Sequence, residues 1–113
     1  MGALAVALGA FGAHALAEAV PVERLNTWRT GASYHLAHAL ALGLAAVVLR
    51  QTGSRLAAIA GWSFLGGMVL FSGSLYALVL LDLPVLGAVA PFGGAAFIAG
   101  WLCLAAAAWR DMG

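Results

Sequence analysis

Charged side chains are scarce in this sequence. Asp, Glu, Lys and Arg make up 8% of its 113 residues, all of its cations are arginines, and the formal net charge is +1. An average soluble domain has about 25% charged residues, so water is not the main solvent of this chain. A protein that binds duplex nucleic acid neutralises several phosphates with clustered cations. The composition therefore excludes a nucleic-acid-binding surface.

The sequence also has only one cysteine and none of the catalytic motifs considered. The single cysteine, Cys103, cannot form an internal disulfide, and we interpret it as a small apolar side chain within an apolar run. The chain has no recognisable pair of nucleophile and base, no glycine loop followed by Lys-Ser/Thr and no zincin motif. We therefore expect a protein that is not an enzyme, and no cofactor is predicted.

Long apolar runs are what the sequence has in abundance. Hydrophobic residues make up 65% of the chain, and the run 56–81 contains no charged side chain. At about 1.5 Å of rise per residue this run reaches nearly 40 Å, which exceeds the roughly 30 Å of a bilayer core. The run predicts a transmembrane helix.

The remaining apolar stretches leave room for three further spans. We predict an all-α membrane protein in which four transmembrane helices form a compact antiparallel bundle, as a single domain over residues 1–113. The expected spans are about 2–17, 31–49, 56–81 and 91–109. The first stretch lacks the basic flank of a signal peptide, so we interpret it as a retained helix. The lipid bilayer is then the first partner of this protein.

The segment 18–30 is the most polar part of the chain. Leu25 and Trp28 lie three residues apart and share a helix face, while the charged side chains mostly point elsewhere. This pattern predicts a short interfacial helix between the first and second spans, with Trp28 at the level of the lipid headgroups.

Arginines are distributed almost evenly over the two ends of the predicted bundle. Arg50, Arg55 and Arg110 lie on the side that both termini share, and Arg24 and Arg29 lie on the other. The positive-inside rule then places both termini in the cytoplasm.

Glycines recur at intervals of seven residues, which return to nearly the same face of a helix. The pairs are Gly2 and Gly9, Gly66 and Gly73, Gly87 and Gly94, and Gly93 and Gly100. Helices in lipid associate largely through close backbone approach at small residues. We predict helix-packing roles for Gly9, Gly12, Gly66, Gly73, Gly87, Gly93, Gly94 and Gly100, with a specific dimerisation groove as the alternative.

Three histidines are the main candidates for chemistry, because ionisable residues inside a span are costly and often functional. His35 and His38 share a helix face, and His14 has Glu18 four residues later. Such a set suits zinc or copper, and two imidazoles from facing helices suit haem iron. Alternatively, each neutral imidazole bonds a nearby backbone carbonyl or a hydroxyl, for example of Ser33, Ser72 or Tyr76, and helps to hold the helices together. A proton or solute path is the third interpretation.

Depth decides whether these histidines can meet. In an unbroken second helix from Pro21, His35 would lie about 21 Å from the turn and His14 only about 9 Å from it. The two would then miss each other. They can meet only if the second span begins near Gly31.

Two serines, Ser72 and Ser74, flank a glycine in the middle of the third span. Serines in lipid usually bond their own preceding turn or an adjacent helix, so we expect a structural role for both.

Several motifs resemble one small family of integral membrane proteins. The residues are Gly9-Ala-Phe-Gly-Ala-His14, Trp28 with Thr30, Gly31 and Tyr34, His38-Ala-Leu-Ala41, Leu70-Phe-Ser-Gly-Ser-Leu-Tyr76, Pro91-Phe-Gly-Gly94 and Gly100-Trp101. They are similar to the transmembrane protein 256 type, catalogued as domain of unknown function 423, over almost the whole chain.

The resemblance implies a four-helix protein of the bacterial plasma membrane without an established activity. Members usually have several more residues before the first glycine motif, so we expect the native start to lie upstream. They commonly carry glutamine at position 35, so a shared role would depend on His14, Tyr34, His38 and the serines.

Our leading hypothesis is a non-enzymatic membrane protein that works by contact. It would act as a homo-oligomer or as an accessory component of a complex with an unidentified membrane-protein partner. The second hypothesis is a small transporter or channel for protons or a small solute, using His14, His38 and Ser72. The third is a haem- or metal-binding module.

Overall fold

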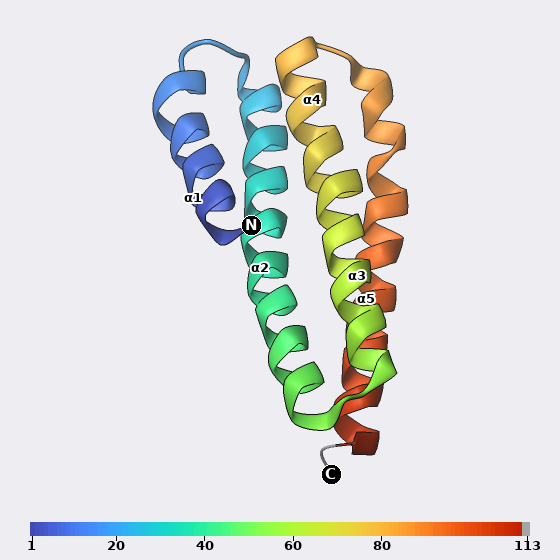
Figure 1. Cartoon of the computed structure of the whole chain (residues 1–113). Helices are drawn as coiled ribbons and strands as arrows, with labels where there is room; N and C mark the ends of the chain where they lie inside the picture. The colour runs from blue at the N-terminus through green and yellow to red at the C-terminus, as the bar shows by residue number, and fades with distance from the viewer. Residues whose placement is uncertain (112–113) are drawn as a thin grey trace.

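The computed structural model describes residues 1–111, and every regular element in this range is helical. Successive helical rods run in alternating directions (Figure 1). The elements are α1 (Gly2–Phe11), the π-helical turn η1 (Gly12–Leu16), α2 (Val22–Thr52), α3 (Arg55–Gly67), the π-helical turn η2 (Met68–Ser72), α4 (Gly73–Leu81), the 3₁₀ turn η3 (Pro84–Ala88) and α5 (Ala90–Asp111).

The helices end where the chain has residues that suit a turn. Gly53 closes α2 with φ +65°, a left-handed conformation that costs glycine little. Asp82 closes α4 with φ 51°, and aspartate is among the few other residues that tolerate this region. The carboxylate of Asp82 also pairs with Arg24 at 3.0 Å, which links this turn to the start of α2.

The predicted interfacial helix is wrong, because α2 runs unbroken for 31 residues from Val22. Nothing after Pro21 interrupts the helix, and the segment 22–30 is its first part. Trp28 does not lie on the outer surface of the molecule. Its side chain is 1% exposed, and its indole Nε1 donates a hydrogen bond to the carbonyl of Leu8 at 2.7 Å.

The helices form a thin, open assembly rather than the predicted compact bundle. Its principal extents are 49 × 25 × 15 Å. The helix α1 packs on α2, α2 packs on α3 and α4, and α5 packs on α3, so α1 and α5 lie at opposite edges (Figure 1). A closed bundle would need these two edges to meet. Neighbouring helices therefore leave much of α2 and of α5 uncovered.

Three of the rods are long and apolar enough to cross a membrane. They are 22–52, 55–81 and 84–111, with 31, 27 and 28 residues. The uncharged run that predicted a span at 56–81 is thus one continuous rod, made of α3, η2 and α4. The fourth apolar segment, Gly2–Leu16, is shorter than a span. The structure thus supports three spans by length, not the four predicted.

Two apolar clusters hold the rods together. The larger cluster joins α2, α3 and α5 around Phe64, which is fully buried, and the smaller joins η1, α2 and α4 around Trp28. The larger cluster contains Ala41, Ala45, Val48, Ala57, Ala60, Phe64, Met68, Phe97, Leu104 and Ala107. Half of these side chains are alanine, which lets the backbones approach closely.

Only some of the predicted packing glycines lie at tight contacts. A Cβ at Gly12 would overlap the indole of Trp28, one at Gly93 would overlap the backbone of Phe71, and one at Gly100 would lie 2.7 Å from the Phe64 ring. Gly67, which the seven-residue spacing did not select, is equally tight against Phe97.

The other predicted glycines have room for a side chain. A Cβ at Gly9 or Gly87 would make ordinary contacts at 3.9 and 3.6 Å, and one at Gly73 would meet only the carbonyl of Met68 at 3.9 Å. Gly66 and Gly94 would meet nothing within 4 Å, so they do not mediate helix contacts. The seven-residue spacing did not distinguish the crowded glycines from the open ones. It specifies which residues share a helix face, but not which helix packs against that face.

Candidate functional site

His38 joins α2 to α5 through one of its ring nitrogens, while the other bonds a carbonyl of α2 itself. Nδ1 lies 2.8 Å from the carbonyl oxygen of Tyr34, and Nε2 accepts a hydrogen bond from the indole Nε1 of Trp101 at 3.0 Å. A carbonyl can only accept and an indole N–H can only donate. These partners therefore require a neutral imidazole with its proton on Nδ1, and neither nitrogen remains free to coordinate a metal.

Aromatic rings surround this imidazole. The His38 ring stacks on Phe97 with 3.6 Å between the ring centroids and an interplanar angle of 12°. Phe64 and Trp101 approach it at centroid distances of 5.7 and 5.9 Å. The His38 side chain is 6% exposed. We name His38, Phe64, Phe97 and Trp101 the aromatic node.

His35 occupies a second buried position one turn earlier on α2. Its Nδ1 lies 3.0 Å from the hydroxyl of Tyr76 in α4, and its Nε2 lies 3.4 Å from the Sδ atom of Met1. The residue is 3% exposed. The interpretation in which each buried imidazole bonds a neighbouring carbonyl or hydroxyl is thus confirmed for His35 and His38.

His14 lies apart from both of them. It is exposed on η1, two residues after Gly12, which lies against Trp28 of α2. Trp28 and His35 are seven residues apart on α2, which is about 10 Å of helix rise. Because α2 is unbroken, His14 and His35 miss each other, as the depth argument requires. Within residues 1–111, no three or more His, Cys, Asp or Glu side chains are grouped to hold a metal ion. The ligand set of His14, His35 and His38 is therefore not assembled.

Ser72 forms the most buried polar contact between α2 and the third rod. Its side chain is 1% exposed, and its hydroxyl donates to the carbonyl of Gly31 at 2.7 Å. A Cβ at Gly31 would lie 3.3 Å from Leu75 and 3.5 Å from the carbonyl of Ser72, so the glycine permits this approach. Ser72 ends the π-helical turn η2, and such turns within α-helices are frequent at functional sites.

Ser74 is buried but bonds within its own rod. Its hydroxyl donates to the carbonyl of Phe71 at 2.8 Å. The two neighbouring serines thus play different roles, since only Ser72 joins two rods. Both fit the structural use expected for serines in lipid.

Replacing Ser72 with alanine should lower the free energy of unfolding by about 1 kcal/mol, because it removes a buried bond between helices. The matched Ser74→Ala variant should change it by less than about 0.5 kcal/mol, since its bond is local. Reversible unfolding in mixed detergent micelles measures both. Equal losses in the two variants would contradict the assignment of Ser72 as the link between rods.

Tyr34 lines the open side of the aromatic node. It is 46% exposed, and its ring lies 4.8 Å from Phe71 and 6.2 Å from Phe97 by centroid distance. Tyr34, His38 and the rings around them therefore form one continuous aromatic cluster between α2 and α5, in which His38, Phe64 and Phe97 are buried and Tyr34 is exposed. The Tyr34 hydroxyl and the His38 imidazole are the candidate functional groups of this cluster.

Trp101 and Phe97 were not among the candidate site residues. Trp101 had one signal in the sequence, because it lies deeper than a tryptophan at the membrane interface should. Phe97 had none, since a phenylalanine in an apolar run looks the same whether it faces lipid or a histidine.

The chain has relatives among bacterial membrane proteins. It is 46% identical over 106 residues to the UPF0382 membrane protein YwdK of Bacillus subtilis, covering 93% of this chain and 86% of the relative. It is 40% identical over 110 residues to the UPF0382 membrane protein SAB0533 of Staphylococcus aureus, covering 97% of this chain and 89% of the relative. No solved structure matches the chain.

A family model also matches most of the chain. The model is described as a protein of unknown function, DUF423, and its match covers residues 8–94. That range includes His14, the whole of α2 with both buried histidines, the whole third rod and the start of α5. The chain therefore belongs to the DUF423 family of membrane proteins of unknown function.

Proposed function

We propose that this protein is a non-enzymatic accessory component of the bacterial plasma membrane that works by helix contact. Its partner is a second copy of itself or a larger membrane protein. The arginine-rich end, with Arg50, Arg55 and Arg110, is proposed to face the cytoplasm. Met1 lies beside His35, near the middle of α2, and therefore not at either end of the rods. The proposed orientation therefore depends on the arginines and not on the position of Met1.

The observation that carries this proposal is the open arrangement of the rods. The most apolar 18-residue windows of 22–52 and 84–111 have 33% and 28% of their residues buried. Large apolar side chains cover the outer faces of both rods: Leu40 is 72% exposed on α2, and Leu102 is 67% exposed on α5. A protein that acts by contact needs such uncovered helix faces.

The polar groups support the same conclusion. Among the described residues, every buried side-chain nitrogen or oxygen has a hydrogen-bond partner. His35, His38 and Ser72 bond Tyr76, Trp101 and the carbonyl of Gly31, so these three side chains link neighbouring rods. The hydroxyl of Ser74 bonds within its own rod. A transport path through His14, His38 and Ser72 finds no support, since His14 is exposed on η1 and the other two bond different carbonyls.

Cysteine cross-linking in native membranes tests the contact role. In a Cys103→Ala background, Leu40→Cys and Leu102→Cys should each be tested for disulfide-linked products, with Ala60→Cys as the control because Ala60 is fully buried. We expect a discrete dimer or a larger adduct from at least one exposed position and none from Ala60. Monomers at both exposed positions, together with a bare monomer in native mass spectrometry, would contradict the proposal.

A further inference from the structure

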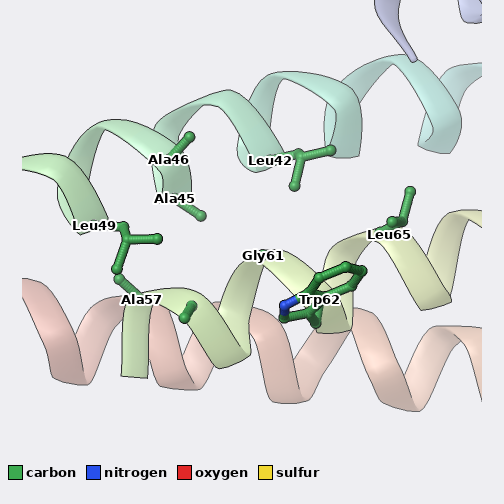
Figure 2. Close-up of a pocket in the computed structure, with 9 residues that line it drawn as sticks. Leu42, Ala45, Ala46, Leu49, Ala57, Gly61, Trp62 and Leu65 are labelled. Carbon is green, nitrogen blue, oxygen red and sulfur yellow. The ribbon is translucent and has the colours of Figure 1, made fainter. Parts of the chain in front are cut away.

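An apolar groove lies between α2 and α3 near the turn that connects them. Its volume is about 200 Å³. Figure 2 shows Leu42 and Leu49 of α2 on one side and Trp62 and Leu65 of α3 on the other. The floor and walls are completed by small residues: Ala45, Ala46, Ala57, Ala58 and Gly61. Trp62 is 73% exposed, so the groove opens outward beside a large aromatic ring.

Two arginines lie close in sequence to the residues at the end of this groove that is nearest the turn. Arg50 follows Leu49 directly, and Arg55 precedes Ala57 by two residues. Both arginines are exposed, and the turn 50–55 contains no carboxylate. The groove therefore joins a hydrocarbon-lined wall to a positively charged end.

The two ends of the molecule differ in how their arginines are used. At the opposite end, Arg24 is paired with Asp82 at 3.0 Å. Near the turn, Arg55, Arg110 and Asp111 line a polar hollow with Thr52 and Ser54. The distance from Arg110 to the carboxylate of Asp111 is 4.0 Å. Among the described residues, this end of the molecule thus has the three arginines Arg50, Arg55 and Arg110 and the one acidic side chain of Asp111, so its net charge is positive.

We propose that this groove binds one acyl chain of an anionic glycerophospholipid whose phosphate is held by Arg50 and Arg55. The chain would follow the groove from Leu49 towards Leu42, a distance of about 10 Å along α2. Replacing one hydrocarbon neighbour by another in a membrane gains little free energy, so the charge of the headgroup supplies the selectivity. This site goes beyond the proposed contact role and does not depend on it.

Native mass spectrometry with two defined lipids tests the charge requirement. The protein, released from nanodiscs that contain equal amounts of phosphatidylglycerol and phosphatidylcholine, should retain phosphatidylglycerol preferentially. Arg55→Gln should lower that retention about fivefold, which corresponds to one cation near an anionic headgroup. Arg29→Gln removes an exposed arginine at the opposite end and should change nothing. Equal retention of both lipids, or equal losses in both variants, would overturn the proposal.

A groove-filling variant tests the shape requirement. Ala46→Leu places extra atoms in the groove and should displace the bound phosphatidylglycerol, whereas Ala37→Leu adds the same atoms elsewhere on the exposed part of α2. Circular dichroism should show that both variants remain folded. Unchanged lipid retention in Ala46→Leu would overturn the proposal. So would a dimer that Ala46→Leu dissociates regardless of lipid, because a second copy would then occupy the groove.

Discussion

Replacing Gly93 with leucine should lower the free energy of unfolding by about 3 kcal/mol, whereas the same change at Gly94 should leave the free energy of unfolding equal to that of the wild type or slightly higher. A Cβ at Gly93 would overlap the backbone nitrogen and Cα of Phe71, and a backbone cannot move aside as a flexible side chain can. Overpacking of this kind typically costs about 1–3 kcal/mol, and a rigid neighbour places it at the upper end.

The neighbouring glycine is an unusually close control. Gly94 lies on the same helix, and a Cβ there would meet nothing within 4 Å. Both substitutions replace glycine with a good helix former, so the gain in helix propensity, about 0.8 kcal/mol or more, is shared. Thermal unfolding in a mild detergent distinguishes the two variants. Similar midpoints would mean that the contact between α5 and η2 does not have the described geometry.

His38→Ala should be the most damaging change to a polar residue, with an expected loss of about 3–5 kcal/mol. It removes a buried ring stacked on Phe97, as large aromatic truncations do, and it leaves the indole N–H of Trp101 without an acceptor. His14→Ala should change stability by less than about 0.5 kcal/mol, because His14 is exposed.

A double-mutant cycle separates the hydrogen bond from the packing of the imidazole. Trp101→Phe retains an aromatic ring at this position and removes only the donor to His38. If the bond stabilises the fold, the effects of His38→Gln and Trp101→Phe should not be additive, with a coupling free energy of about 0.5 to 1.5 kcal/mol. Full additivity would show that the aromatic node is held by packing alone.

The helical class and the membrane environment were readable from local features. The uncharged run 56–81 forms one rod over 55–81, and Pro21, Gly53 and Asp82 lie at the turns that bound α2 and α4. The family resemblance was confirmed as well. These features depend on composition and on residues near one another in sequence, so they need no knowledge of the tertiary contacts.

The interfacial helix was mispredicted because the polar residues of 18–30 were interpreted as a helix separate from the second span. Glu23 and Arg29 are exposed on α2, Arg24 pairs with Asp82 at the end of α4, and Trp28 faces α1 and α4. An amphipathic helix at a bilayer surface and the polar end of a long helix have the same sequence pattern. Only the packing of α1 against residues 22–30 distinguished the polar end of a long helix from an interfacial helix.

The sequence by itself determined the kind of solvent, the helical rods and the residue types that could carry chemistry. The tertiary structure decided which of those residues meet: His38 with Trp101 over a separation of 63 residues, and Ser72 with Gly31 over a separation of 41. It also decided that Gly93 is crowded while Gly94 is open. The physical reason is that helix periodicity specifies which residues share a face, whereas the partner of that face depends on how the rods pack.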